Sequence, residues 1–155
     1  MTIDPTVADL LAKARTAQAL YEKFNQAEVD DVVAAIAWVV LEPVRNQHLS
    51  ERAVEDTGLG DIDDKFTKNY RKTLGLLRDL TGAPSVGVIA TNSKRGLVEI
   101  ARPIGVVGAI TPSTNPVATP TNKVMNALKG GNAIILAPSP RGEAVCGELV
   151  DLFRE

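Results

Sequence analysis

Residues 105–116 read Gly-Val-Val-Gly-Ala-Ile-Thr-Pro-Ser-Thr-Asn-Pro, a nearly apolar run that ends in a turn rich in hydroxyl and amide groups. A continuous apolar strand is typical of a parallel sheet that is covered on both faces. A helical segment at 117–128, a second apolar strand at 133–137 and a helix at 143–153 follow in α/β order. The sequence therefore predicts the first βαβα of a doubly wound parallel sheet.

Two short β-branched runs precede this unit, at residues 85–91 and 97–101. The five residues between them, Asn-Ser-Lys-Arg-Gly at 92–96, are typical of a turn, so the pattern predicts a β-hairpin. Two parallel strands are too few to bury both faces of a doubly wound sheet. We therefore expect the chain to hold only part of such a domain.

The residues before the hairpin have helical periodicity. Apolar side chains recur at steps of three and four in three stretches, 7–24, 29–40 and 62–77. Asn25, with Glu28 three residues later, predicts an N-cap with a capping box, and Gly58 and Gly60 on either side of Leu59 predict a C-cap. We expect three or four helices in this lead-in.

These sequence patterns together predict an α/β protein with three parts. Residues 1–83 form a helical N-terminal lead-in, residues 84–102 form the hairpin, and residues 103–155 begin the parallel sheet. The net charge changes along the chain: ten basic and fourteen acidic side chains in residues 1–80 give −4, whereas seven and five in residues 81–155 give +2. The length of 155 residues favours a single domain.

Composition makes several partners and locations improbable. The formal net charge is −2 without a block of like charges, so nothing favours a nucleic acid as the main partner. No stretch reaches the ~18 apolar residues of a membrane span. A single cysteine, Cys146, excludes an internal disulfide framework and fits a reducing compartment. We expect a cytoplasmic protein with no nucleic-acid or membrane partner and no metal site.

The turn after the first parallel strand is the main candidate for a binding site. Ligands in open α/β sheets lie beyond the carboxyl ends of the strands, where this chain places Ser113, Thr114 and Asn115. The alternative is that these three side chains merely cap the next helix. Neither G-x-G-x-x-G nor a P-loop is present.

Other polar residues offer weaker candidates. Lys123 follows the turn on the next helix, where its ammonium either points to the site or is solvated. His48 has no partner spacing for a metal or a catalytic triad, so we interpret it as structural or exposed. Cys146 lacks a basic neighbour that would lower the pKa of its thiol, which makes it a poor nucleophile.

Three stretches of this sequence resemble a known family. They are residues 53–60 (Ala-Val-Glu-Asp-Thr-Gly-Leu-Gly) with 64–65 and 68–69, residues 105–116, and residues 123–140. The chain is similar to the N-terminal part of the aldehyde dehydrogenase superfamily, in its coenzyme A-acylating branch. The resemblance covers most of residues 50–145, and it implies that residues 103–155 begin a Rossmann-like domain that binds NAD or NADP.

The resemblance also implies site residues. It assigns cofactor-binding positions to Ile110, Thr111, Pro112, Ser113, Thr114, Ala137, Pro138 and Ser139. Asn115 resembles the asparagine that helps to form the oxyanion hole, although ordinary aldehyde dehydrogenases have that asparagine one position earlier, at Thr114 here. Lys123 matches a lysine on the helix behind the active site.

One departure from the ordinary enzymes supports the acylating branch. Where this chain has Ala137, they have a lysine that holds the adenine ribose of the cofactor. Acylating relatives share its loss, and in them coenzyme A must enter a cleft that the dinucleotide also uses.

The resemblance implies a reaction in which a small aldehyde, coenzyme A and NAD(P)⁺ give an acyl-CoA and NAD(P)H. The catalytic cysteine of that family lies beyond the region seen here, so we expect this chain alone to be inactive. The alternative is a non-catalytic module that binds nucleotide or pairs with full-length subunits. The hairpin at 84–102 corresponds to an oligomerisation module, so we expect a homo-oligomer.

Overall fold

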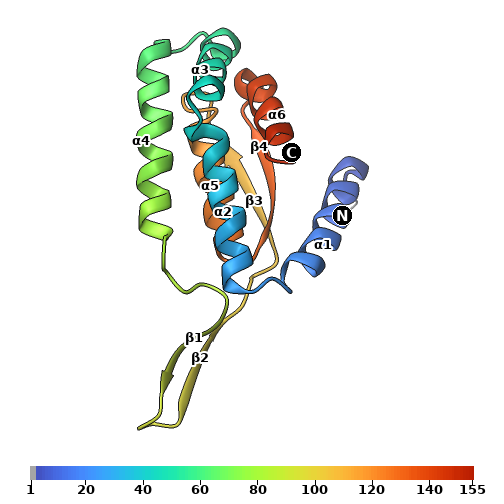
Figure 1. The fold of residues 1–155 in the computed structure, drawn as a ribbon. Coiled ribbons are helices and arrows are strands. Elements are labelled where there is room, and N and C mark those ends of the chain that lie inside the picture. The colour runs from blue at the N-terminus through green and yellow to red at the C-terminus, as the bar shows by residue number, and fades with distance from the viewer. Residues whose placement is uncertain (1–2) are drawn as a thin grey trace.

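The computed structural model describes residues 3–155, which form a helical lead-in, a hairpin and a βαβα unit (Figure 1). The helices are α1 (Pro5–Tyr21), α2 (Gln26–Leu41), α3 (Pro43–Thr57), α4 (Ile62–Leu80), α5 (Ala118–Lys129) and α6 (Glu143–Leu152), with a 3-10 turn at Pro140–Gly142. The strands are β1 (Gly87–Asn92), β2 (Leu97–Ala101), β3 (Val106–Thr111) and β4 (Ala133–Pro138).

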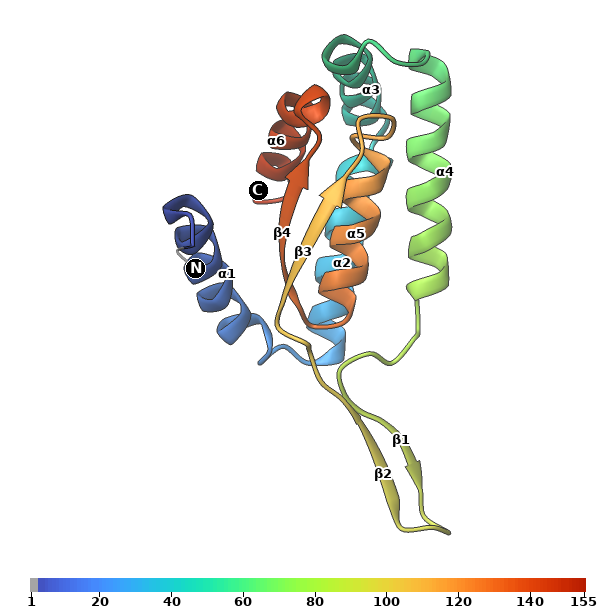
Figure 2. The same cartoon turned by 180° about the vertical axis from the view of Figure 1, so that it is seen from behind.

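The strands form two separate pairs, as the sequence predicts. β1 and β2 pair antiparallel and project away from the helices as an arm (Figures 1 and 2). β3 and β4 pair parallel, with Val106 opposite Ala133 and Thr111 opposite Pro138. The predicted α/β class and the parallel start of the sheet are therefore confirmed.

Local sequence signals explain most helix ends. Asn25 accepts hydrogen bonds from the first turn of α2 while the Glu28 side chain accepts one from the Asn25 backbone N–H, so the predicted capping box is present. α3 ends at Gly58, whose φ of 64° lies in the left-handed region that favours glycine. The prediction for the first helix was too long, because the chain leaves α1 at Tyr21 and turns toward the Asn25 cap.

Helices pack around the β3–β4 pair. α5 lies between the sheet and α2, with α4 beside them, and α1 contacts β3 and β4 on the side away from α4 (Figures 1 and 2). A first buried cluster joins α2, α5 and β4; its members include Val29, Val33, Ile36, Val124 and Met125, against which Ile134 and Leu136 pack. A second joins α2, α3 and α6 through Val40, Leu49, Ala53, Val145 and Leu149.

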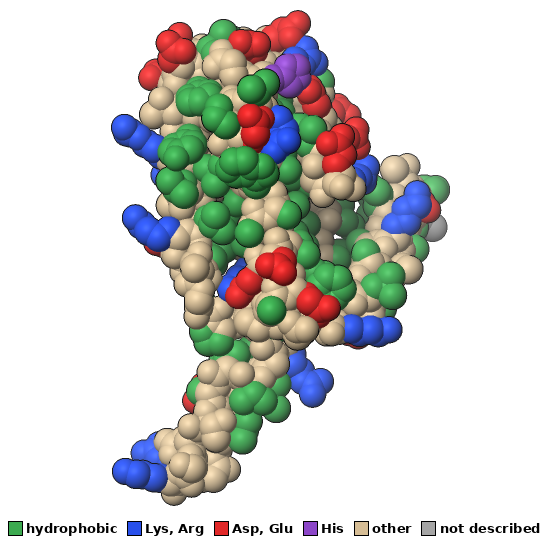
Figure 3. Space-filling view, viewed as in Figure 1, with side chains coloured by type: hydrophobic (Ala, Val, Ile, Leu, Met, Phe, Trp, Pro, Cys, Tyr) green, Lys and Arg blue, Asp and Glu red, His purple; other side chains and the backbone are tan. Residues whose placement is uncertain are grey.

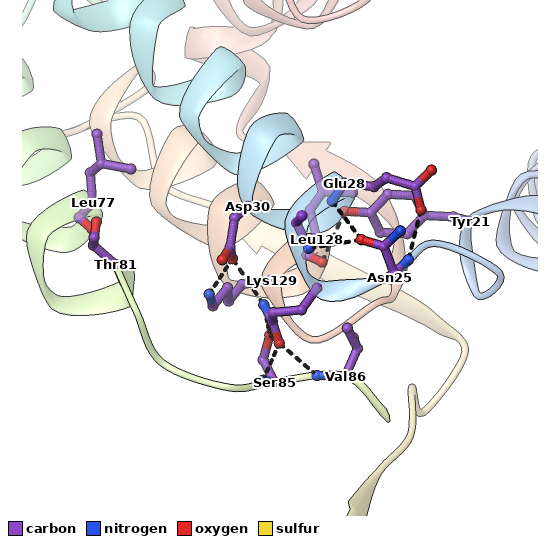
Figure 4. A network of polar contacts seen from close by, with 12 residues as sticks. Tyr21, Asn25, Glu28, Asp30, Leu77, Thr81, Ser85, Val86, Leu128 and Lys129 are labelled. Atoms are coloured by element: carbon purple, nitrogen blue, oxygen red, sulfur yellow. Dashed lines mark hydrogen bonds and ion pairs between the residues drawn. The ribbon is translucent and has the colours of Figure 1, made fainter. Parts of the chain in front are cut away.

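Polar contacts fix the lower ends of these helices. Gln26 accepts hydrogen bonds from the backbone of Ser85 and Val86, which ties the base of the hairpin to α2. Close by, Lys129 at the end of α5 forms an ion pair with Asp30 on α2 (Figure 4). Tyr21 donates to the Leu128 carbonyl over 3.1 Å, and burial together with Asp30 raises the pKa of Tyr21 to about 12.

Candidate functional site

The candidate site lies at the carboxyl ends of β3 and β4. The Ser139 N–H donates to the Thr111 carbonyl over 2.9 Å, so the two strand ends are joined where both loops begin. The loops also pack together, since a Cβ on Gly142 would lie 2.9 Å from the Cβ of Pro116. Residues 112–116 and 138–142 therefore form one continuous edge, as expected for parallel strands.

Ile110 and Ala137 form an open apolar surface at this edge. They are register partners on the adjacent strands, and because side chains alternate along a strand they share one face of the sheet. Ile110 is 82% exposed and Ala137 is also exposed, whereas Thr111, the last residue of β3, is buried. A flat apolar ring of a ligand has room to lie on this surface.

The other residues predicted to bind a cofactor lie at the same edge of the sheet. Pro112 and Thr114 are exposed, and Ser113, Pro138 and Ser139 are half-buried. The structure thus brings the two predicted segments together at one edge.

The N-terminal turns of α5 and α6, which follow the two strand-end loops, differ in how their backbone N–H groups are bonded. α5 begins after Val117 without a side-chain cap, so the alternative that Ser113, Thr114 or Asn115 caps this helix is wrong. In its first turn the Thr119 N–H donates to the Asn115 backbone carbonyl over 3.2 Å. At α6, the Asp56 carboxylate accepts a 3.0 Å hydrogen bond from the Val145 N–H. A carboxylate thus already interacts with this helix end, which disfavours a second anion there.

Asn115 and Lys123 line a common cavity of about 310 Å³ between α4 and α5. The Asn115 Oδ1 is buried without a hydrogen-bond partner in the described chain, and the Lys123 side chain is exposed. Lys123 therefore points to the open side of the site rather than into the core.

The sequence did not indicate the other residues of this cavity, among them Lys68 and Lys72 on α4 and Asn122 on α5. The spacing of Lys65, Lys68 and Lys72 places these lysines on one face of α4. That spacing was the available signal, but it does not reveal which element the face meets.

Neither His48 nor Cys146 lines the cavity that Asn115 and Lys123 share. His48 on α3 contacts Glu148 on α6, which also pairs with Arg52 at 3.4 Å. Cys146 is buried, and burial raises the pKa of its thiol, which disfavours the nucleophilic thiolate.

Over residues 3–155, no three His, Cys, Asp or Glu side chains gather closely enough to hold a metal ion. No helix in that range is long and apolar enough to span a bilayer.

Comparison with known proteins identifies the family. Residues 4–155 match the model of the aldehyde dehydrogenase family. The chain belongs to this family. The resemblance of its motifs to aldehyde dehydrogenases is thereby confirmed.

The similar curated aldehyde dehydrogenases include acylating enzymes. A sulfoacetaldehyde dehydrogenase (acylating) from Cupriavidus necator is 61% identical over 147 residues, which are 95% of this chain and 30% of that protein. Another, from Bilophila wadsworthia, is 41% identical over 96% of this chain and 32% of its own length. The chain thus spans about a third of the length of these relatives.

Solved aldehyde dehydrogenase structures show the same fold. An acetylating aldehyde dehydrogenase from Geobacillus thermoglucosidasius superposes with a TM-score of 0.90 and 33% identity, covering 96% of this chain and 32% of that one. A Rhodopseudomonas palustris propionaldehyde dehydrogenase with bound propionyl-CoA superposes with a TM-score of 0.79 and 30% identity. The match covers 92% of this chain and 31% of that one. An engineered glycolyl-CoA reductase with bound NADP⁺ superposes with a TM-score of 0.78 and 29% identity. The match covers 92% of this chain and 32% of that one.

Proposed function

We propose that this chain is the N-terminal, cofactor-binding portion of an NAD(P)-dependent, coenzyme A-acylating aldehyde dehydrogenase. The observation that carries the proposal is the 61% identity to an acylating sulfoacetaldehyde dehydrogenase over 95% of the chain. The whole enzyme would convert an aldehyde, coenzyme A and NAD(P)⁺ into an acyl-CoA and NAD(P)H. In this assignment residues 1–83 and 103–155 belong to the cofactor domain, and residues 84–102 are the oligomerisation hairpin.

The edge of the β3–β4 pair suits a dinucleotide and coenzyme A. When bound, NAD(P)⁺ supplies the hydride acceptor. Ile110 and Ala137 offer it an apolar surface, and Ala137 leaves open the space that a lysine would fill. Similar structures with bound propionyl-CoA or NADP⁺ support both ligands.

Asn115 and Lys123 are the proposed residues near the reacting carbonyl. The Asn115 carboxamide lines the cavity, whereas the Thr114 side chain is exposed, which favours Asn115 as the oxyanion donor. A single donor of this kind contributes about 3–4 kcal/mol to transition-state stabilisation in comparable reactions. Lys123 supplies positive charge on the open side of the same cavity.

A chimera tests the proposal. This chain would replace the matching 147-residue segment of the Cupriavidus necator enzyme. We expect the chimera to form NAD(P)H from sulfoacetaldehyde only when coenzyme A is present, and the 155-residue chain alone to form none. Asn115→Ala in the chimera should lower kcat by about 10²–10³-fold.

Two outcomes would contradict this function. One is a chimera that folds, by circular dichroism and light scattering, but has no coenzyme A-dependent activity. The other is NADH formation by the chain alone that Cys146→Ala abolishes, since that would make Cys146 the nucleophile.

A further inference from the structure

One face of α4 carries an uncompensated positive charge. Lys65, Lys68 and Lys72 stand at positions i, i+3 and i+7, which share a helix face. None of the three forms an ion pair with another residue in the described range 3–155. Lys65 is only 4% exposed, and its burial together with the charge of Lys68 lowers the pKa of its ammonium. In Figure 3, basic side chains project along α4.

This face borders the cavity between α4 and α5. The polar side chains that line the cavity are Lys68, Lys72, Lys123, Asn115, Asn122, Asn126 and Thr119. No acidic side chain is among its lining residues. The volume of about 310 Å³ lies at the lower end of the range for small-molecule sites.

Two carboxamides in the cavity have unused hydrogen-bonding capacity. The Oδ1 atoms of Asn115 and Asn122 are buried without a partner in the described chain. A buried polar atom without a partner costs about 1–3 kcal/mol, so such atoms commonly mark the place of a ligand. An amide that rotates by 180° about its Cβ–Cγ bond presents two N–H donors instead of the oxygen.

An anionic group satisfies this set of side chains better than a neutral one. A sulfonate keeps its negative charge at neutral pH and has three acceptor oxygens, to which ammonium and amide N–H groups can donate hydrogen bonds. A neutral aldehyde would leave the positive charge of Lys68, Lys72 and Lys123 without a counter-charge in the cavity. Asn115 and Lys123 also place the anion close to the proposed position of the reacting carbonyl.

We propose that this cavity is the specificity subsite for a sulfonate group on a short aldehyde substrate, and that Lys68 and Lys72 hold the sulfonate. The proposal rests on the acylating dehydrogenase function above and names the substrate class of that site. Lys68 and Lys72 are specificity residues, and the chemistry at the carbonyl does not involve them.

An NMR titration tests the subsite in the 155-residue chain. The ligand is isethionate, the stable alcohol analogue of a two-carbon sulfonated aldehyde, added at constant ionic strength. We expect saturable shifts at the side-chain amides of Asn115 and Asn122, and none with ethylene glycol. Lys68→Gln and Lys72→Gln should each raise Kd at least threefold, and Lys72→Arg should keep it near the original value.

Arg71→Gln is the matched control, because Arg71 is exposed on the same helix but does not line the cavity. An equal loss of binding in this variant would show diffuse charge attraction and overturn the proposal. So would an unchanged Kd in both lysine variants, whose folding is checked by their amide spectra. A second titration with coenzyme A separates the two sources of an anion: if coenzyme A gives the same shifts and displaces isethionate, the cavity holds its phosphates instead.

The subsite and the proposed function can fail separately. An inactive chimera with intact isethionate binding would reject the acylating function. An active chimera with no isethionate binding at this cavity would reject the subsite.

Discussion

Asn132 joins two segments that lie far apart in the sequence. Its Oδ1 accepts from the backbone N–H groups of Ile104 and Gly105 at 2.7 and 2.9 Å. Its Nδ2 donates to the Gly130 carbonyl at 3.0 Å. One side chain therefore fixes the start of β3 against the turn that leads into β4.

We expect Asn132→Ala to destabilise the chain by about 2 kcal/mol, because it leaves two partly buried backbone N–H groups without their acceptor. The corresponding fall in Tm is roughly 4–8 °C for a domain of this size. Asn126→Ala is the control, since Asn126 is exposed and its side chain bonds only locally, to the Asn122 carbonyl. Thermal unfolding that moves equally in both variants would refute this role.

Catalytic roles were assigned to single residues only through resemblance to the family. Asn115 and Lys123 were predicted through resemblance, and the structure places both beside one cavity. Lys68 and Lys72 were missed because their partner surface, α5, lies some fifty residues further along the chain. Side-chain spacing shows which face a residue occupies, but only tertiary packing shows what that face meets.

The sequence predicted the helix ends that local residues cap, but not the one that a residue from another helix caps. The capping box at Asn25 and the glycine cap at Gly58 are local signals, and both are present in the structure. The cap of α6 is not local, because Asp56 on α3 accepts from the Val145 N–H across 89 positions of sequence. No pattern around residue 143 could have indicated that partner.

We expect Asp56→Ala to weaken α6 by about 1 kcal/mol, which is the usual cost of losing a side-chain cap. Hydrogen exchange should become faster at the first amides of α6, Val145 above all, while exchange in α2 stays unchanged. Glu55→Ala is the matched control, since Glu55 is a neighbouring exposed carboxylate that pairs only with Arg52. Equal protection of Val145 in Asp56→Ala and the parent chain would rule out this cap.

The molecule as a whole leaves apolar surface uncovered on its projecting arm. Val88 and Ile100 are register partners in the hairpin, and Val98 lies on the same face as Ile100. All three side chains are more than half exposed. A two-stranded hairpin is marginally stable alone, and its free edges pair readily with another strand. These properties favour a second copy of the chain as the cover of this surface.

We therefore expect the purified chain to elute as a dimer or larger species, with at least twice the 16.5 kDa mass of one copy by light scattering. The double variant Val98→Lys with Ile100→Lys should be monomeric, because it brings like charges onto the face that must be buried and blocks edge pairing. Lys94→Gln, in the exposed turn of the same hairpin, should keep the assembly. A parent chain that stays monomeric at high concentration would mean that the arm contacts something other than its own copy.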